Sequence, residues 1–78
     1  MGRSPVPSSL VTLATRLKAA RERKQLTIQE AYDLTGIHVG RLEANRANMT
    51  VLTLLTLCRF YEVQPADIIR DLEMTTDS

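Results

Sequence analysis

Seventy-eight residues allow one small domain, and an apolar fraction of 44% with three glycines and three prolines indicates a folded, helical chain. One cysteine excludes an internal disulfide, and no apolar run approaches the roughly 20 residues that a membrane span requires. The N-terminal residues lack the apolar segment of a signal peptide, so we expect a soluble, cytoplasmic protein.

The net charge of +1 hides an asymmetry between the two halves of the chain. Residues 1–48 hold eight Lys and Arg against four Asp and Glu, whereas residues 49–78 hold two against five, so the halves carry +4 and −3. This division suits a protein that places one end on phosphates and keeps the other end away from them. Chance segregation on a small solvated surface gives the same pattern.

Residues 1–9 contain two prolines among small polar residues, and we expect them to form a flexible tail. Ser8 or Ser9 is suited to cap a first helix over about 10–24, because a serine oxygen accepts a hydrogen bond from an unpaired backbone N–H. Spacings of three and four place one set of side chains on the inner face of that helix: Leu10, Leu13, Ala14, Leu17, Ala20 and Arg21.

A second, short helix is predicted over about 28–34. Thr27 is a good N-cap for it, and Glu30 three residues later completes a capping box. Gly36 then marks a turn or a close approach of the backbone.

A third helix is predicted from Gly36 or Ile37 to Ala44, with Val39 and Leu42 facing inward and Asn45 suited to end it. Gly40 lies inside this helix, where glycine costs about 1 kcal/mol relative to alanine. We interpret it as permitting close approach to a bound molecule or to the second helix, and tolerated drift is the alternative.

Two further helices complete the predicted all-α fold. Thr50 caps the fourth, which runs to about residue 61, and Pro65 suits the first turn of a fifth over 65–72, with Ile68 inward. Residues 73–78 are polar and are expected to fray. The inner stripe of the fourth helix is predicted to be Leu54, Leu57, Cys58 and Tyr61.

Three segments in this order resemble the lambda-repressor/Cro (XRE-type) family of helix-turn-helix DNA-binding domains. Residues 21–27 are similar to the end of the family's first helix and the cap of its second, Leu42-Glu43 to the apolar-Glu pair that ends the recognition helix, and residues 48–54 to the following loop and helix start. The resemblance covers residues 13–72. It implies a five-helix lambda-repressor-like DNA-binding domain over residues 10–72, with Arg21 and Glu43 forming an ion pair between the first and third helices.

One spacing departs from the family pattern, because only seven residues lead from Gly36 to Glu43, fewer than usual. Either the turn is compressed or Gly36 is not the turn glycine. Counting back from Glu43 instead places Thr35 at the cap of the third helix, and we adopt that register. Its inward residues are then Leu34, Val39 and Leu42.

The resemblance implies that the start of the third helix lies in the major groove of DNA. Arg41 is the strongest candidate, because Arg to guanine is the commonest specific contact, and an exposed Ile37 is suited to a thymine methyl group. His38 either contacts DNA or simply caps or packs. Gln29 and Arg46 are suited to phosphates. The full set of predicted DNA contacts is Thr27, Gln29, Thr35, Gly36, Ile37, His38, Arg41 and Arg46.

The last two helices carry more apolar surface than a small monomer needs, which favours a homodimer. Scattered exposed leucines are the alternative interpretation. A dimer of this family would set two recognition helices about 34 Å apart and read a palindromic site. The predicted interface residues are Leu52, Leu55, Ile69 and Leu72.

We therefore expect a transcriptional regulator of bacterial or phage type that binds double-stranded DNA as a homodimer. Two alternatives remain open: a protein-interaction module, such as an antitoxin or adaptor, and an architectural DNA binder without sequence preference. An enzyme is the weakest hypothesis, because one Cys and one His make no usual metal site and no Ser or Cys has a plausible base. We expect no cofactor and no small-molecule substrate, and Cys58 should be a small buried hydrophobe.

Overall fold

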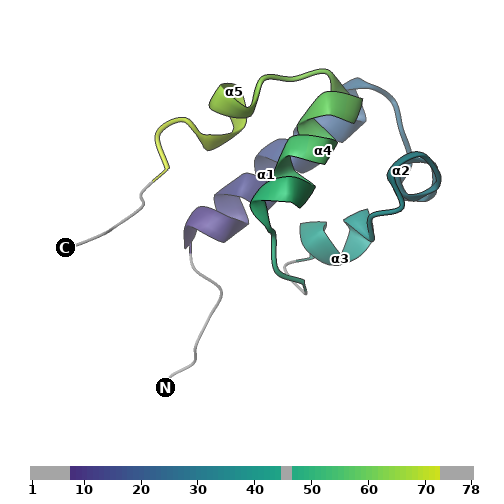
Figure 1. Ribbon diagram of the computed structural model, residues 1–78, viewed down its shortest axis with the longest axis horizontal. Coiled ribbons are helices and arrows are strands. Elements are labelled where there is room, and N and C mark those ends of the chain that lie inside the picture. Colours follow the sequence, from purple (N-terminus) through teal and green to yellow (C-terminus); the bar gives the residue numbers. More distant parts are fainter. Residues whose placement is uncertain (1–7, 45–46, 73–78) are drawn as a thin grey trace.

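The computed structural model describes residues 8–44 and 47–72, and these residues fold into five helices with no strand among them. The helices α1 and α4 lie side by side through the middle of the molecule, with α2 at one end, α5 at the other and α3 beneath (Figure 1). No helix in the described part is both long enough and apolar enough to cross a membrane. The bounds are α1 Ser8–Arg23, α2 Ile28–Thr35, α3 Val39–Glu43, α4 Val51–Tyr61 and α5 Pro65–Ile69.

The predicted caps of α2 and α4 are confirmed. The Thr27 hydroxyl accepts the Glu30 N–H at 3.0 Å, and the Glu30 carboxylate accepts the Thr27 N–H at 2.8 Å, which is a complete capping box. At the start of α4, the Thr50 hydroxyl accepts the Thr53 N–H at 3.1 Å. Each bond satisfies a backbone donor that the first turn of a helix leaves unpaired.

Both long helices end in the same backbone motif, and neither uses glycine for it. Gln25 after α1 and Glu62 after α4 adopt the left-handed conformation, each with φ of 59°. The next amides, of Leu26 and Val63, donate to the carbonyl five residues earlier at 3.2 and 2.9 Å. The side chains of Leu26 and Val63 then pack against the core, which fixes the direction in which the chain leaves each helix.

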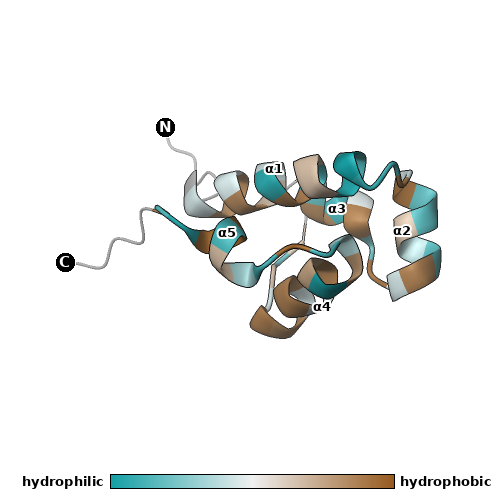
Figure 2. Ribbon diagram, turned by 90° about the horizontal axis from the view of Figure 1, so that it is seen from above, coloured by the Kyte–Doolittle hydropathy of each residue, from teal (hydrophilic) through white to brown (hydrophobic). Residues whose placement is uncertain are grey.

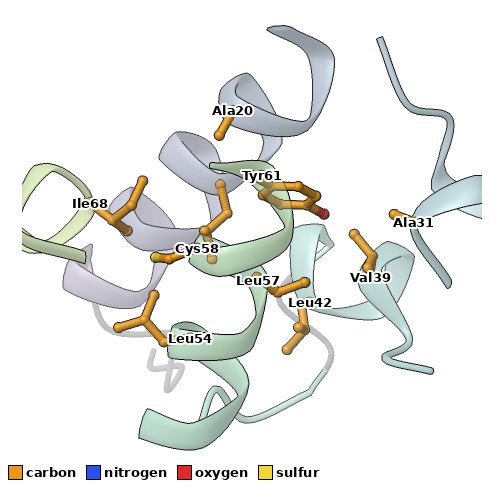
Figure 3. Packing of buried hydrophobic residues seen from close by; sticks show 10 residues of the cluster. Ala20, Ala31, Val39, Leu42, Leu54, Leu57, Cys58, Tyr61 and Ile68 are labelled. Atoms are coloured by element: carbon orange, nitrogen blue, oxygen red, sulfur yellow. The ribbon is translucent and has the colours of Figure 1, made fainter. Parts of the chain in front are cut away.

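The core lies where α4 meets the other four helices (Figure 3). The inner stripe predicted for α4 is confirmed, as are the inward positions of Val39, Leu42 and Ile68. Ala20 of α1 and Ala31 of α2 are each at most 1% exposed, and these small side chains let both helices pack closely against α4. The core cluster comprises Leu17, Ala20, Ala31, Val39, Leu42, Leu54, Leu57, Cys58, Tyr61 and Ile68.

A buried ion pair joins α1 to α3, as predicted. The Arg21 guanidinium donates from Nε to Glu43 Oε2 at 2.7 Å and from Nη2 to Glu43 Oε1 at 3.0 Å. Its remaining Nη1 donates to the Leu26 carbonyl at 2.7 Å. The two side chains are 8% and 9% exposed, and the hydrogen bond to Glu43 raises the pKa of Arg21 against the opposing effect of desolvation. The bidentate geometry therefore fixes the orientation of the two side chains relative to each other.

The register adopted from the sequence for α3 is wrong. Thr35 is the last residue of α2, and Gly36 ends that helix in the left-handed conformation with φ of 75°. Leu34, expected to face inward, is 54% exposed. The short interval to Glu43 is accommodated by a turn at 36–38 followed by a helix of five residues, so α3 begins at Val39 and not at residue 36 or 37.

Two other helix bounds differ from the prediction. The helix α5 ends at Ile69 and not at residue 72, and the Arg16 guanidinium donates to the carbonyls of Ile68, at 2.8 Å, and Arg70. The Arg16 side chain thereby supplies hydrogen-bond donors to carbonyls at the end of α5, where no further helical turn follows. At the other end of the chain α1 begins at Ser8, so Ser9 lies inside the helix and is not its cap. The predicted terminal segments otherwise lie outside the described residues.

Glu43→Ala should lower the free energy of unfolding by about 3 kcal/mol or more, because it leaves the Arg21 guanidinium buried without its carboxylate. Glu22→Ala is the matched control: that carboxylate lies 3.9 Å from the same guanidinium but is 58% exposed. It should change stability by less than about 0.5 kcal/mol. Urea denaturation followed by circular dichroism measures both, and equal losses would contradict the role given to the buried pair.

Tyr61 should make the protein sensitive to alkaline pH. Its hydroxyl is buried and has no hydrogen-bond partner among the described residues, and burial, with the negative Glu43 nearby, raises the pKa of Tyr61 to about 12. In the unfolded chain the pKa of the tyrosine hydroxyl is near 10, so the unfolded state releases this proton first. The free energy of unfolding is therefore unaffected below about pH 10 and falls as the pH rises from about 10 to 12. Tyr61→Phe should retain more of its stability across that interval than the wild type does, whereas the exposed Tyr32→Phe should follow the wild type. Parallel pH profiles of all three proteins would refute this.

Candidate functional site

An open groove of about 480 Å³ lies between α2 and α3. It brings together three of the predicted contact residues, Gln29, His38 and Arg41. The remaining lining comes from residues that were not among the predicted DNA contacts. These are Ile28, Tyr32, Val39, Gly40 and Ala44.

An aromatic pair forms one wall of the groove. The rings of Tyr32 and His38 stack with their centroids 4.9 Å apart and their planes 27° from parallel. His38 occupies the N-cap position of α3 but makes no capping hydrogen bond with its side chain. Contact with DNA, capping and packing were the roles considered for His38. Its side chain does not cap α3, and it packs on the Tyr32 ring while remaining exposed.

Gly40 lets α2 and α3 approach each other. A Cβ atom at Gly40 would lie 3.3 Å from Cγ2 of Ile28, which is tighter than most such contacts. The structure therefore shows the predicted close approach of Gly40 to the second helix. As a result the Ile28 side chain lies over the backbone of α3, next to Arg41.

The groove is not strongly basic. Arg41 is exposed and is the sole Lys or Arg between residues 28 and 44, where Glu30 and Asp33 contribute negative charge. The Gln29 amide donates to Asp33 Oδ1 at 2.9 Å. The basic excess of the first half of the chain lies instead on and just after α1: Arg16, Lys18, Arg21, Arg23 and Lys24.

The α2 N-terminus is already occupied by a carboxylate. Because Glu30 accepts the Thr27 N–H there, the positive end of the helix is partly neutralised. The Thr27 side chain accepts the Glu30 N–H in return, so its observed role is capping.

Three other predicted contact residues, Thr35, Gly36 and Ile37, do not line the groove. The Thr35 hydroxyl donates to the Ala31 carbonyl at 2.8 Å and accepts the Ile37 N–H at 3.0 Å. Ile37 is half-buried and packs against the core, so its predicted exposure is wrong. Gly36 forms the turn itself, and Arg46 lies outside the described residues.

The residues predicted for a dimer interface separate into two sites. Leu52 and Leu55 are 74% and 45% exposed and line a shallow depression on α4 together with Thr56, Arg59 and Phe60. Hydrophobic residues are conspicuous on this helix in Figure 2. Ile69 is 45% exposed and Leu72 is half-buried, and neither lines that depression.

A sequence signal for the missed groove residues does exist. Ile28 and Tyr32 are four residues apart, so they share a face of α2, and Ala31 rather than either of them supplies the buried residue of that helix. Residues 28, 32 and 38 become neighbours only once the turn at Gly36 is placed correctly.

No cluster of three or more His, Cys, Asp or Glu that could hold a metal ion occurs among the described residues. Comparisons of the chain with protein-family models, with curated proteins and with solved structures found no match. The groove, the α4 surface and the charges around them are therefore the features of this structure that bear on function.

Proposed function

We propose that this protein is a lambda-repressor-like helix-turn-helix regulator that binds duplex DNA with α2 and α3. The observation that carries the proposal is the way α3 is held. Its inner residues Val39 and Leu42 are at most 6% exposed, and Glu43 is fixed by Arg21, while Arg41 between them faces the groove and solvent. A short helix anchored on one side and exposed on the other is what insertion into a major groove requires.

The length of α3 limits how much sequence one copy reads. At about 1.5 Å per residue, five residues extend about 7.5 Å, which is roughly two base-pair steps of about 3.4 Å. Arg41 is suited to O6 and N7 of a guanine, and the fixed imidazole of His38 to a neighbouring base edge or phosphate. Direct recognition by one copy therefore covers few base pairs.

Such limited recognition favours two copies acting together. The exposed leucines of α4, Leu52 and Leu55, provide an apolar surface through which a homodimer is expected to form. Two half-sites about 34 Å apart then double the number of base pairs read and make the site palindromic. Basic side chains of α1, such as Lys18 and Arg23, add attraction to phosphates that weakens as salt is raised.

A protein-interaction module is the second candidate. Two exposed apolar side chains, Ile28 at 45% and Tyr32 at 39%, line the groove beside its one cation. An amphipathic partner chain with an acidic residue opposite Arg41 would fit such a surface. The experiment below separates the two candidates.

Selection from a random pool of duplexes should recover a palindrome, and Arg41→Ala should weaken binding to it at least tenfold, the range expected for loss of a bidentate contact to guanine. Arg70→Ala removes a charge that is 67% exposed beyond α5 and serves as the control, with a much smaller loss. Fluorescence anisotropy at fixed salt measures both variants. A single half-site without symmetry would contradict the dimer, and failure to enrich any sequence would favour the protein-partner candidate.

A further inference from the structure

Ile28 is an apolar side chain for which the fold has no evident use. It is the first residue of α2, it is 45% exposed, and it is not part of the core cluster. Its Cγ2 and Cδ1 atoms lie over Gly40, where a Cβ would come within 3.3 and 3.9 Å. The side chain is thereby held in the groove beside Arg41.

Three of the other apolar side chains of this region are already engaged within the fold. Val39 is 2% exposed, and Ile37 packs against the core. Tyr32 stacks on His38, which leaves its ring covered on one face. Ile28 and the methyl group of Ala44 are therefore the exposed aliphatic groups of the groove, and Ile28 is the larger of the two.

The major-groove edge of DNA offers one methyl group, the 5-methyl of thymine, which aliphatic side chains contact. We propose that Ile28 contacts the methyl group of a thymine next to the base pair that Arg41 contacts. This inference rests on the proposed function, because it assigns a specificity-determining residue within the same groove. It predicts a thymine near a guanine in each half-site.

Deoxyuridine tests this directly, because it lacks only the methyl group and keeps the hydrogen-bonding edge of thymine. In the selected duplex each thymine is replaced in turn, symmetrically in both half-sites, and binding is measured by anisotropy. One replacement should weaken wild-type binding about three- to fourfold per half-site, the effect of one buried methyl group. The same replacement should leave the binding of Ile28→Ala unchanged.

Leu34→Ala is the matched control, since Leu34 is 54% exposed on the same helix and does not line the groove. It should discriminate thymine from deoxyuridine as the wild type does. Ile28→Val keeps the Cγ2 methyl group nearest Gly40 and removes only Cδ1, so it should fold and retain part of the discrimination.

The outcomes separate this inference from the function on which it rests. Equal binding of every deoxyuridine duplex by the wild type, or equal discrimination by Ile28→Ala, overturns the assignment of Ile28 and leaves DNA binding intact. Failure to select any duplex overturns both the assignment and the proposed function.

Discussion

The buried ion pair between Arg21 and Glu43 is the interaction on which the rest of this structure depends. Two hydrogen bonds join Arg21, near the end of α1, to Glu43 at the end of α3, and a third joins Arg21 to the carbonyl of Leu26. An isolated helix of five residues has no stability of its own, because helix nucleation is unfavourable and short helices do not repay it. Val39 and Leu42, which are buried, and Glu43, which pairs with Arg21, hold α3 in place. The opposite edge of α3, with Arg41, stays exposed to solvent.

Much of the fold is predictable from the sequence because local rules act there. One capping box, a second threonine cap, helical periodicity and a first-turn proline predicted α1, α2, α4 and α5, and the resemblance to a known family supplied the Arg21–Glu43 pair. The turn before α3 was not predictable in the same way. Two arrangements fit the short interval after Gly36, and only tertiary packing, which buries Ile37 and exposes Leu34, decides between them. The left-handed caps at Gln25 and Glu62 also escape prediction, because residues other than glycine rarely adopt that conformation.

The candidate site could be predicted only in part, for the same reason. Arg41 and His38 could be predicted from their place near the start of α3, whereas Ile28 and Tyr32 join them only because α2 packs onto α3.

The charge asymmetry of the chain predicts the position of the site equally incompletely. The basic residues gather on α1, and several are already engaged: Arg16 with backbone carbonyls, Arg21 with Glu43 and Lys24 with Glu62. Affinity for DNA would then depend on shape and on few cations, which is compatible with weak binding by one copy and stronger binding by two.

The central claim is that the face formed by α2 and α3 meets duplex DNA. Titration of the ¹⁵N-labelled protein with a short duplex, followed by amide chemical shifts, tests it most directly. The account predicts the largest changes at the groove, including Gln29, His38 and Arg41, and their attenuation as salt is raised. Changes confined to α4 or to the side of α1 away from the groove, with the groove amides unmoved, would contradict it.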